Sequence, residues 1–395
     1  MRDNRITPTR LTAALLPAAL ALTLAPSAAV TAQAQSSDLS SLSSNRGISD
    51  GLRPSDPPKR TPIEVEKNPE IPGLPEGVKV DRIEWITSRR VAVFIKSAAM
   101  PKELIQVQIL LARDWHSNPT AKFPEVWALD GLRARDDENG WTIETNIEQF
   151  YADKNVNVIL PVGGESSFYS DWQRENNGKH YKWETFLTKE LPGPIEKQLG
   201  ADSRRAIVGF SMSGTSALVL PTKIPGFYDA AASFSGCAAT STWAPYNFAR
   251  LTVNRGAGAA GANYQNVTPE QMWGPMGGDY NRWNDALVNA DKLRGTALYV
   301  STATGLASEN DMMGTLIGKG ATQAEASAAA MTLQIEGGVI EAAINSCNHD
   351  LRAKLENLQI PAHYEFRNVG THSWPDWRKD LENSWWKTIK PAFKM

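Results

Sequence analysis

The chain has 395 residues, with 41 Lys and Arg against 43 Asp and Glu, and its formal net charge is −2. This near-neutral balance argues against a nucleic-acid-binding protein, because such proteins normally carry a basic face. A hydrophobic content of 42% with 21% charged residues excludes a disordered chain and allows one large domain with a sizeable core.

The first 34 residues have the pattern of a signal peptide. Arg2, Arg5 and Arg10 precede an apolar run from Leu11 to Leu24, and Ala32-Gln33-Ala34 offers a cleavage site. A retained membrane anchor is the competing interpretation, but the prolines and the Ala/Thr content of this segment weaken it as a membrane span. We therefore predict a protein that is secreted or held at the cell envelope, with no transmembrane helix in the mature chain.

Residues 35–75 are rich in Ser, Asp and Pro and show no apolar period. This composition predicts an extended N-terminal arm, so that the folded domain comprises residues 76–395. The chain has only two cysteines, Cys237 and Cys347. Export permits a disulfide between them, with two free thiols as the alternative, and no zinc site can be built from this pair.

Short apolar strands alternate with helical segments through the rest of the chain. The expected strands are 90–96, 103–111, 126–129, 156–161, 206–210, 230–234, 298–301 and 362–369. The expected helices are 147–153, 182–199 with a break at Pro192-Gly193-Pro194, 213–222, 324–330 onwards and 339–358. This alternation predicts an α/β fold with a mainly parallel central sheet and helices on both faces. Residues 240–294 interrupt the alternation and are predicted to form an insertion over the C-terminal edge of the sheet, where ligands bind in such folds.

A serine follows one of these strands directly. Ser211 lies in Gly209-Phe210-Ser211-Met212-Ser213-Gly214, between an apolar strand and a helix. A nucleophilic serine needs such a sharp turn with small neighbours, which holds its Oγ outside the sheet. Ser213 stands where the general Gly-x-Ser-x-Gly pattern has glycine, and an ordinary turn with a solvent-facing serine is the alternative.

A serine nucleophile requires a base and an acid that orients the base. His372 follows the last predicted strand, which is where the base of an α/β-hydrolase stands. The acid is expected after the strand 298–301, and both Glu309 and Asp311 are available there. The residues alone do not separate these two carboxylates.

Acyl transfer also needs two backbone N–H donors for the oxyanion. One is expected from Met212, which follows the serine, and the other from Leu132, in a glycine turn that follows an earlier strand.

Seven blocks of the chain, from about residue 80 to 390, together resemble the secreted mycolyltransferases of the antigen 85 family. They are Leu129-Asp130-Gly131-Leu132-Arg133-Ala134, Asp136-Asp137-Glu138-Asn139-Gly140-Trp141, the run from Pro161 to Trp172, Tyr181-Lys182-Trp183-Glu184-Thr185-Phe186-Leu187, the Ser211 block, Met272-Trp273-Gly274-Pro275 and Gly370-Thr371-His372-Ser373-Trp374. The cysteines resemble the arrangement of the corynemycolate branch of this family.

The resemblance implies a single-domain α/β-hydrolase that moves a mycolyl group through a seryl ester. Trehalose monomycolate would be the donor, and a second trehalose monomycolate or cell-wall arabinogalactan the acceptor, with no cofactor or metal. Ser211 then resembles the nucleophile, His372 the base and Glu309 the acid.

Further site residues follow from the same resemblance. Leu132 and Met212 correspond to the oxyanion donors, and Asp130, Arg133 and Trp374 match positions that hold trehalose. Ala239 departs from the family, which has an acidic sugar contact there. A secreted serine carboxylesterase and mycolyl transfer to protein hydroxyls are the alternative functions.

Overall fold

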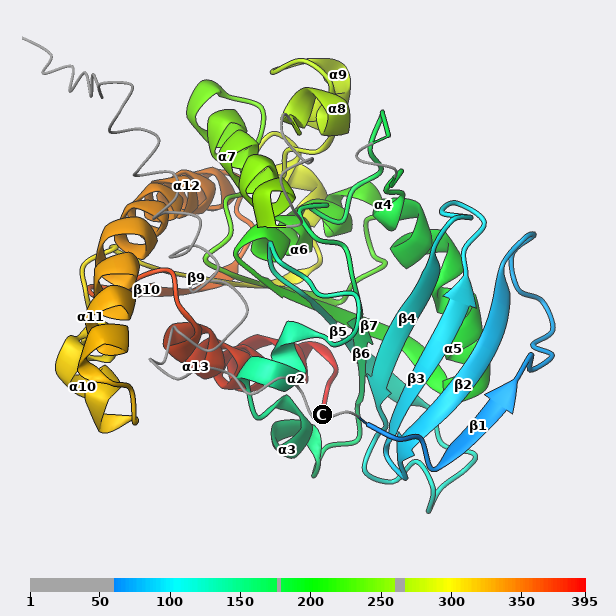
Figure 1. Cartoon of the computed structure of the whole chain (residues 1–395). Coiled ribbons are helices and arrows are strands. Elements are labelled where there is room, and N and C mark those ends of the chain that lie inside the picture. The colour runs from blue at the N-terminus through cyan, green and yellow to red at the C-terminus, as the bar shows by residue number, and fades with distance from the viewer. Residues whose placement is uncertain (1–59, 176–178, 260–266) are drawn as a thin grey trace, which may run out of the picture.

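The structure, a computed structural model, describes residues 60–175, 179–259 and 267–395 (Figure 1). The predicted signal peptide and the arm as far as residue 59 lie outside the described residues. The strands are β1 Glu64–Lys67, β2 Lys79–Thr87, β3 Arg90–Lys96, β4 Leu104–Leu110, β5 Phe123–Leu129, β6 Asn157–Pro161, β7 Ala201–Phe210, β8 Ala230–Phe234, β9 Ala297–Ala303 and β10 Ala362–Arg367.

Helices connect these strands, with short 3-10 or π segments labelled η. They are α2 Gly140–Glu144, α3 Ile147–Tyr151, α4 Trp183–Thr185, η2 Phe186–Glu190, α5 Pro192–Leu199, α6 Met212–Lys223, α7 Trp243–Ala259, α8 Pro269–Trp273, α9 Asp279–Trp283, η3 Ala290–Leu293, η4 Glu309–Asp311, α10 Met313–Gly318, α11 Gln323–Thr332, η5 Leu333–Gly337, α12 Gly338–Asn357, α13 Trp374–Ser384, η6 Trp385–Ile389 and α14 Lys390–Ala392. No described helix is both long and apolar enough to span a membrane.

The ten strands form one sheet in the order β1-β2-β3-β4-β6-β5-β7-β8-β9-β10. The six strands from β6 to β10 are parallel, while β1 to β4 are antiparallel to one another and β4 is antiparallel to β6. The mainly parallel sheet of the prediction is confirmed. β1 and β2 were not predicted, and β1 extends the sheet from within the segment expected to be an arm. Every residue of β1 is exposed, so this edge strand has no apolar alternation to reveal it.

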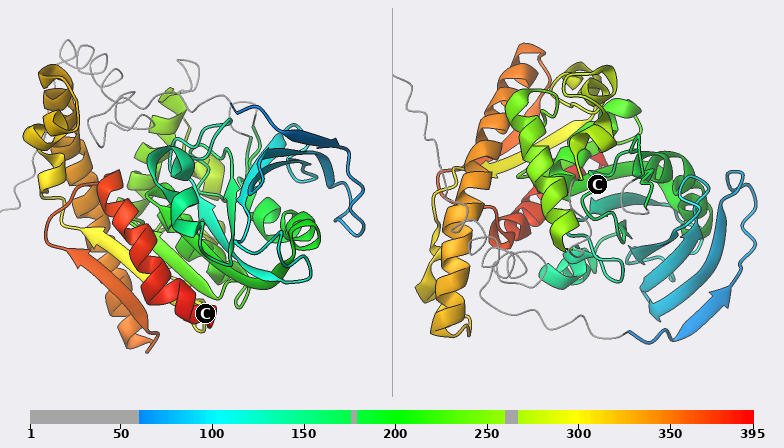
Figure 2. Two further views of the ribbon diagram at one scale, coloured as in Figure 1. Left: turned by 90° about the horizontal axis from the view of Figure 1, so that it is seen from below. Right: turned by 45° about the horizontal axis from the view of Figure 1, so that its top comes forward.

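Side chains alternate between two cores along the central strands, since successive residues of a strand point to opposite faces. On β5, Val126 and Ala128 belong to one core, and Trp127 and Leu129 to the other. Helices α2, α3 and α13 with η6 contribute to the first core, and η2, α5, α6 and α12 to the second. Figure 2 shows α13 lying across one face of the sheet. The prediction of helices on both faces is therefore confirmed.

Two excursions leave the regular alternation. The first runs from α7 to η3 between β8 and β9, and it matches the predicted insertion; α7, α8 and α9 lie above α6 in Figure 1. The second comprises η4, α10, α11 and η5 between β9 and α12. The break predicted within 182–199 at Pro192-Gly193-Pro194 falls one residue earlier, at Leu191 between η2 and α5. Pro192 is the first residue of α5, where a missing N–H costs nothing.

Candidate active site

Ser211 stands at the sharp turn between β7 and α6. Its backbone has φ 56° and ψ −123°, an unfavourable conformation for a residue with a side chain. Gly209 makes the turn possible, because a Cβ there would overlap the Ser213 carbonyl oxygen. Ser213 replaces the usual glycine without disturbing the turn: its Oγ accepts a hydrogen bond from the Phe210 N–H at 3.0 Å and lies 3.0 Å from the Leu129 carbonyl oxygen. The sequence therefore builds the strained turn that exposes a serine Oγ.

His372 lies beside this serine on the loop between β10 and α13. Its Nε2 is 2.7 Å from the Ser211 Oγ, and its Nδ1 is 2.8 Å from Oε2 of Glu341. An ionised carboxylate can only accept, so Nδ1 carries the proton and Nε2 accepts from the serine hydroxyl. The backbone N–H of His372 donates to the Gly337 carbonyl oxygen at 3.2 Å. This is the geometry of a serine, a base and an orienting acid.

The acid in this arrangement is Glu341, and the predictions for Glu309 and Asp311 as the partner of His372 are wrong. Glu309 is exposed at the start of η4. Asp311 is fully buried, but it accepts hydrogen bonds from the Ser308 N–H at 2.7 Å and the Thr371 hydroxyl at 2.8 Å. It therefore fixes the loop before His372 without contacting the imidazole.

The path of the chain after β9 explains why the acid lies on α12. The acid was expected in the loop that leaves β9, but the chain first forms η4, α10, α11 and η5 and then returns as α12. Glu341 lies one turn into α12 and is 1% exposed. Its Oε1 accepts from the Ala303 N–H at 2.8 Å, at the end of β9. A signal was present, because Glu341 is the only Asp, Glu, Lys or Arg between Glu336 and Asp350. An isolated acid in an otherwise uncharged stretch is worth testing as a site residue.

The two expected oxyanion donors lie in segments that contact one common loop. Met212 is the first residue of α6, and Leu132 lies in the turn after β5; neither amide donates a hydrogen bond within the described part of the chain. The loop after β6 touches both residues, because the Ser166 N–H donates to the Leu132 carbonyl oxygen at 2.9 Å and the Phe168 N–H lies 3.4 Å from the Met212 sulfur. Two N–H groups are thus available for a developing negative charge.

Comparisons with known proteins identify the relatives of this chain. The family described as "Putative esterase" matches residues 97–385. The diacylglycerol acyltransferase/mycolyltransferase Ag85B of Mycolicibacterium smegmatis is 35% identical over 267 residues, which cover 65% of this chain and 74% of that protein. The chain belongs to the antigen 85 family. Ag85C of Mycobacterium leprae is 34% identical, with 65% and 71% covered. The crystal structure of Mycobacterium tuberculosis MPT51 (FbpC1) has a TM-score of 0.57 at 22% identity, covering 75% of this chain and 96% of that one.

These matches make the chain an enzyme of the antigen 85 mycolyltransferase and esterase family with the α/β-hydrolase fold. The predicted disulfide of this antigen 85 protein is confirmed, because Cys237 and Cys347 are bonded. Cys237 follows β8 and Cys347 lies in α12, so the bridge joins the serine side of the site to the helix that carries Glu341.

All three residues expected to hold a sugar are largely buried, and the contacts of Asp130 and Trp374 are well defined. Asp130 is 4% exposed, and its two carboxylate oxygens accept from the Gly131 and Gly140 N–H groups, each at 2.7 Å. Burial raises the pKa of Asp130 to about 6 in spite of these bonds. Trp374 is 9% exposed and packs with Trp141, Phe210 and Trp377 beneath the serine turn.

Arg133, the third of these residues, is 8% exposed beside Leu132. The half-buried Glu165 lies in the adjoining loop, and burial raises its pKa to about 7, while the charges of Lys179 and Arg133 oppose this shift. Ala239, at the position where the family has an acidic sugar contact, is buried and supplies no polar group. Arg133 and Glu165 are therefore charged groups adjacent to Leu132, the expected oxyanion donor.

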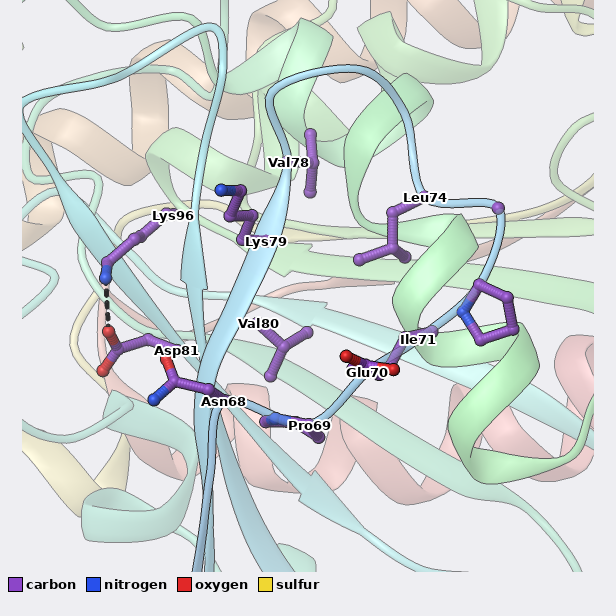
Figure 3. Close-up of a pocket in the computed structure, with 12 residues that line it drawn as sticks. Asn68, Pro69, Glu70, Ile71, Leu74, Val78, Lys79, Val80, Asp81 and Lys96 are labelled. Atoms are coloured by element: carbon purple, nitrogen blue, oxygen red, sulfur yellow. Dashed lines mark ion pairs between the residues drawn. The ribbon is translucent and has the colours of Figure 1, made fainter.

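A hollow of about 730 Å³ lies elsewhere, over β2 and the segment before it (Figure 3). Its lining includes Ile71, Leu74 and Val80, together with the ion pair between Asp81 and Lys96 at 2.6 Å. It contains no serine or histidine, so it offers no nucleophile for acyl transfer. Among the described residues no cluster of His, Cys, Asp or Glu could hold a metal ion.

Proposed function

We propose that this protein transfers a mycolyl group from trehalose monomycolate, through an ester of Ser211, to a second trehalose monomycolate or to cell-wall arabinogalactan. The observation that carries the proposal is the 2.7 Å contact between the Ser211 Oγ and Nε2 of His372, with Glu341 behind the imidazole. Membership of a family of mycolyltransferases supplies the class of acyl group.

In the first half of the reaction, Nε2 of His372 takes the hydroxyl proton of Ser211 as Oγ attacks the ester carbonyl carbon. The Leu132 and Met212 N–H groups stabilise the tetrahedral oxyanion, and Glu341 stabilises the imidazolium. The carbon–oxygen bond to trehalose then breaks, and the leaving oxygen takes the proton from Nε2. The mycolyl group is left as an ester of Ser211.

In the second half, a sugar hydroxyl enters the position that trehalose has left. His372 takes its proton, the new oxygen attacks the seryl ester, and Ser211 leaves with the proton returned by Nε2. Transfer requires that the acceptor outcompete water. We assign sugar binding to the surface near Arg133 and Glu165, because these charged groups are adjacent to Leu132, the expected oxyanion donor.

The same triad supports a second function, that of a secreted serine carboxylesterase, in which water attacks the seryl ester. The match to the family described as "Putative esterase" favours this alternative. A hydroxyl group of a protein is a third acceptor with the same chemistry. We propose that the mature chain is exported, as the N-terminal segment predicts, and acts at the cell envelope.

Mass spectrometry of the products separates these functions. The purified mature protein is incubated with trehalose monomycolate, in parallel with Ser211→Ala and with the exposed control Ser117→Ala. We expect trehalose dimycolate and free trehalose from the wild type and from Ser117→Ala, and neither from Ser211→Ala. Free mycolic acid without dimycolate would refute sugar-to-sugar transfer and support the esterase.

A further inference from the structure

Ser235 follows β8 directly and lies behind the acid of the proposed triad. It is 4% exposed, and its backbone has φ 49°, a conformation that residues with a side chain rarely adopt. Its N–H donates to the Ser301 carbonyl oxygen at 2.9 Å. The next residue is Gly236, where a Cβ would overlap the backbone of Gly214 in α6. Close packing on both sides therefore holds the Ser235 side chain in one place.

The hydroxyl of Ser235 has two neighbours, and these fix the direction of its hydrogen bonds. Trp377 Nε1 is 3.1 Å from the Ser235 Oγ, and Oε1 of Glu341 is 2.9 Å from it. An indole N–H can only donate, so the Ser235 oxygen accepts from Trp377. Its own proton is then directed to Glu341. The two hydrogen bonds therefore run in one direction, from Trp377 through Ser235 to the Glu341 carboxylate.

The Ser235 hydroxyl donates to one carboxylate oxygen of Glu341, Oε1, and leaves the other, Oε2, free for the base. Oε1 also accepts from the Thr302 hydroxyl at 3.0 Å and from the Ala303 N–H at 2.8 Å. With three donors on Oε1, the carboxylate cannot rotate without losing several charge-assisted bonds. Oε2 therefore faces Nδ1 of His372, at 2.8 Å.

Trp377 contacts His372, the base, as well as Ser235. Its ring meets the His372 imidazole edge to face, with 5.0 Å between ring centroids and 84° between planes. One side chain thus limits the movement of the imidazole and orients the hydroxyl that holds the acid. We propose that Ser235 and Trp377 form a positioning pair that holds the Glu341 carboxylate and the His372 imidazole in the geometry needed for proton transfer. This proposal rests on the Ser211 triad of the proposed function.

The test compares Ser235→Ala with a matched control on β8, the strand that precedes Ser235. Ser233 is fully buried, and its hydroxyl has no hydrogen-bond partner in the described part of the chain, so Ser233→Ala removes an equivalent group that lies outside the chain of bonds. The measurements are kcat and KM for a short p-nitrophenyl ester and the rate of labelling by a fluorophosphonate. We expect Ser235→Ala to lower kcat and labelling about tenfold with KM changed less than twofold, and Ser233→Ala to stay within twofold of the wild type.

A double-mutant cycle separates positioning from a general effect on folding. In a Glu341→Gln background the hydroxyl has no carboxylate to hold, so Ser235→Ala should cost less than twofold more. Trp377→Phe keeps an aromatic ring against His372 but removes the N–H; it should lower kcat about threefold to tenfold, and adding Ser235→Ala should cost little further.

Two results overturn the inference. In the first, the fold losses of kcat for Ser235→Ala and for Glu341→Gln, or for Ser235→Ala and for Trp377→Phe, multiply in full in the double variant. Ser235 would then act independently of that partner. Labelling of Ser235→Ala at the wild-type rate would show that its hydroxyl has no part in positioning. A wild-type protein that reacts with neither the ester nor the fluorophosphonate would instead refute the triad itself, so the two failures are distinguishable.

Discussion

Gly305 and Gly338 lie against each other where β9 has ended and α12 begins. A Cβ on Gly305 would overlap the Gly338 carbonyl oxygen, and a Cβ on Gly338 would lie 2.7 Å from the Gly305 carbonyl oxygen. Glu341 follows one turn later on α12. Because neither glycine has a side chain, the helix approaches the sheet closely enough to bring this carboxylate to His372.

Gly305→Ala should therefore displace the start of α12. Gly305 has φ 85°, so alanine brings both backbone strain, of about 1–2 kcal/mol, and a collision with Gly338. We expect kcat for a short ester to fall at least tenfold, together with a lower melting temperature. Gly295→Ala is the matched control, because Gly295 has φ 93° but open space around its Cβ position. Equal losses of kcat in the two variants would contradict the role of the close approach.

Glu341→Gln tests the corrected assignment of the acid. Glutamine keeps the shape of the side chain but removes the charge that stabilises the imidazolium, so we expect kcat to fall by about 10³-fold or more, as for the orienting acids of other triads. Glu309→Gln should remain within twofold of the wild type, since Glu309 is exposed. Steady-state kinetics on both variants decides the assignment, and the reverse order of losses would restore Glu309.

Much of the site was predictable because its signals are local. The strand before Ser211, the helix after it and the glycine two residues earlier belong to one continuous segment. His372 likewise lies a few residues after the end of β10, in the short loop before α13. A turn that requires small residues is visible in the sequence itself. The serine–histidine pair was therefore predictable from local sequence, and the disulfide from the presence of only two cysteines in the chain.

The acid was not predictable in the same way. Its position depends on the long excursion between β9 and α12, and on the contact between Gly305 and Gly338, which are 33 positions apart in the chain. Burial also depends on the tertiary structure: Asp130, Arg133 and Trp374 were all expected to hold a sugar, and each is mostly covered by neighbouring segments. β1 was missed because four exposed residues form no pattern.

The disulfide should contribute strongly to stability. Cys237 and Cys347 are separated by 110 positions, and closing a loop of about 100 residues stabilises the folded chain by about 4–5 kcal/mol through lost entropy of the unfolded state. We expect a clear drop in the denaturant midpoint when a reductant is added. The double variant Cys237→Ser/Cys347→Ser should already have the lower midpoint and should not respond to reductant. Identical midpoints for the oxidised and reduced wild type would contradict this prediction.

Glu125 should make stability depend on pH. It is fully buried on β5, and burial raises the pKa of its carboxyl to about 7 from an ordinary value of 4.5. The folded chain therefore binds more protons at this group than the unfolded chain does. Its stabilising contribution is complete below pH 4.5 and is lost as the pH rises to 7, by at most about 1.4 kcal/mol per pH unit.

Glu125→Gln removes this titration. Unfolding free energies measured between pH 4.5 and 7 should fall less steeply for the variant than for the wild type. The exposed Glu76→Gln serves as the control and should keep the slope of the wild type. A variant that follows the wild-type curve at every pH would show that Glu125 has an ordinary pKa.

The most direct test of the proposed mechanism is to trap the seryl ester. The mature protein is mixed with trehalose monomycolate, quenched in acid, digested and examined by mass spectrometry for the peptide that contains Ser211. We predict a mass increase equal to one mycolyl group on that peptide and its absence from Ser211→Ala. Formation of transfer products by Ser211→Ala, or a mycolyl group attached only to another residue, would contradict the proposed mechanism.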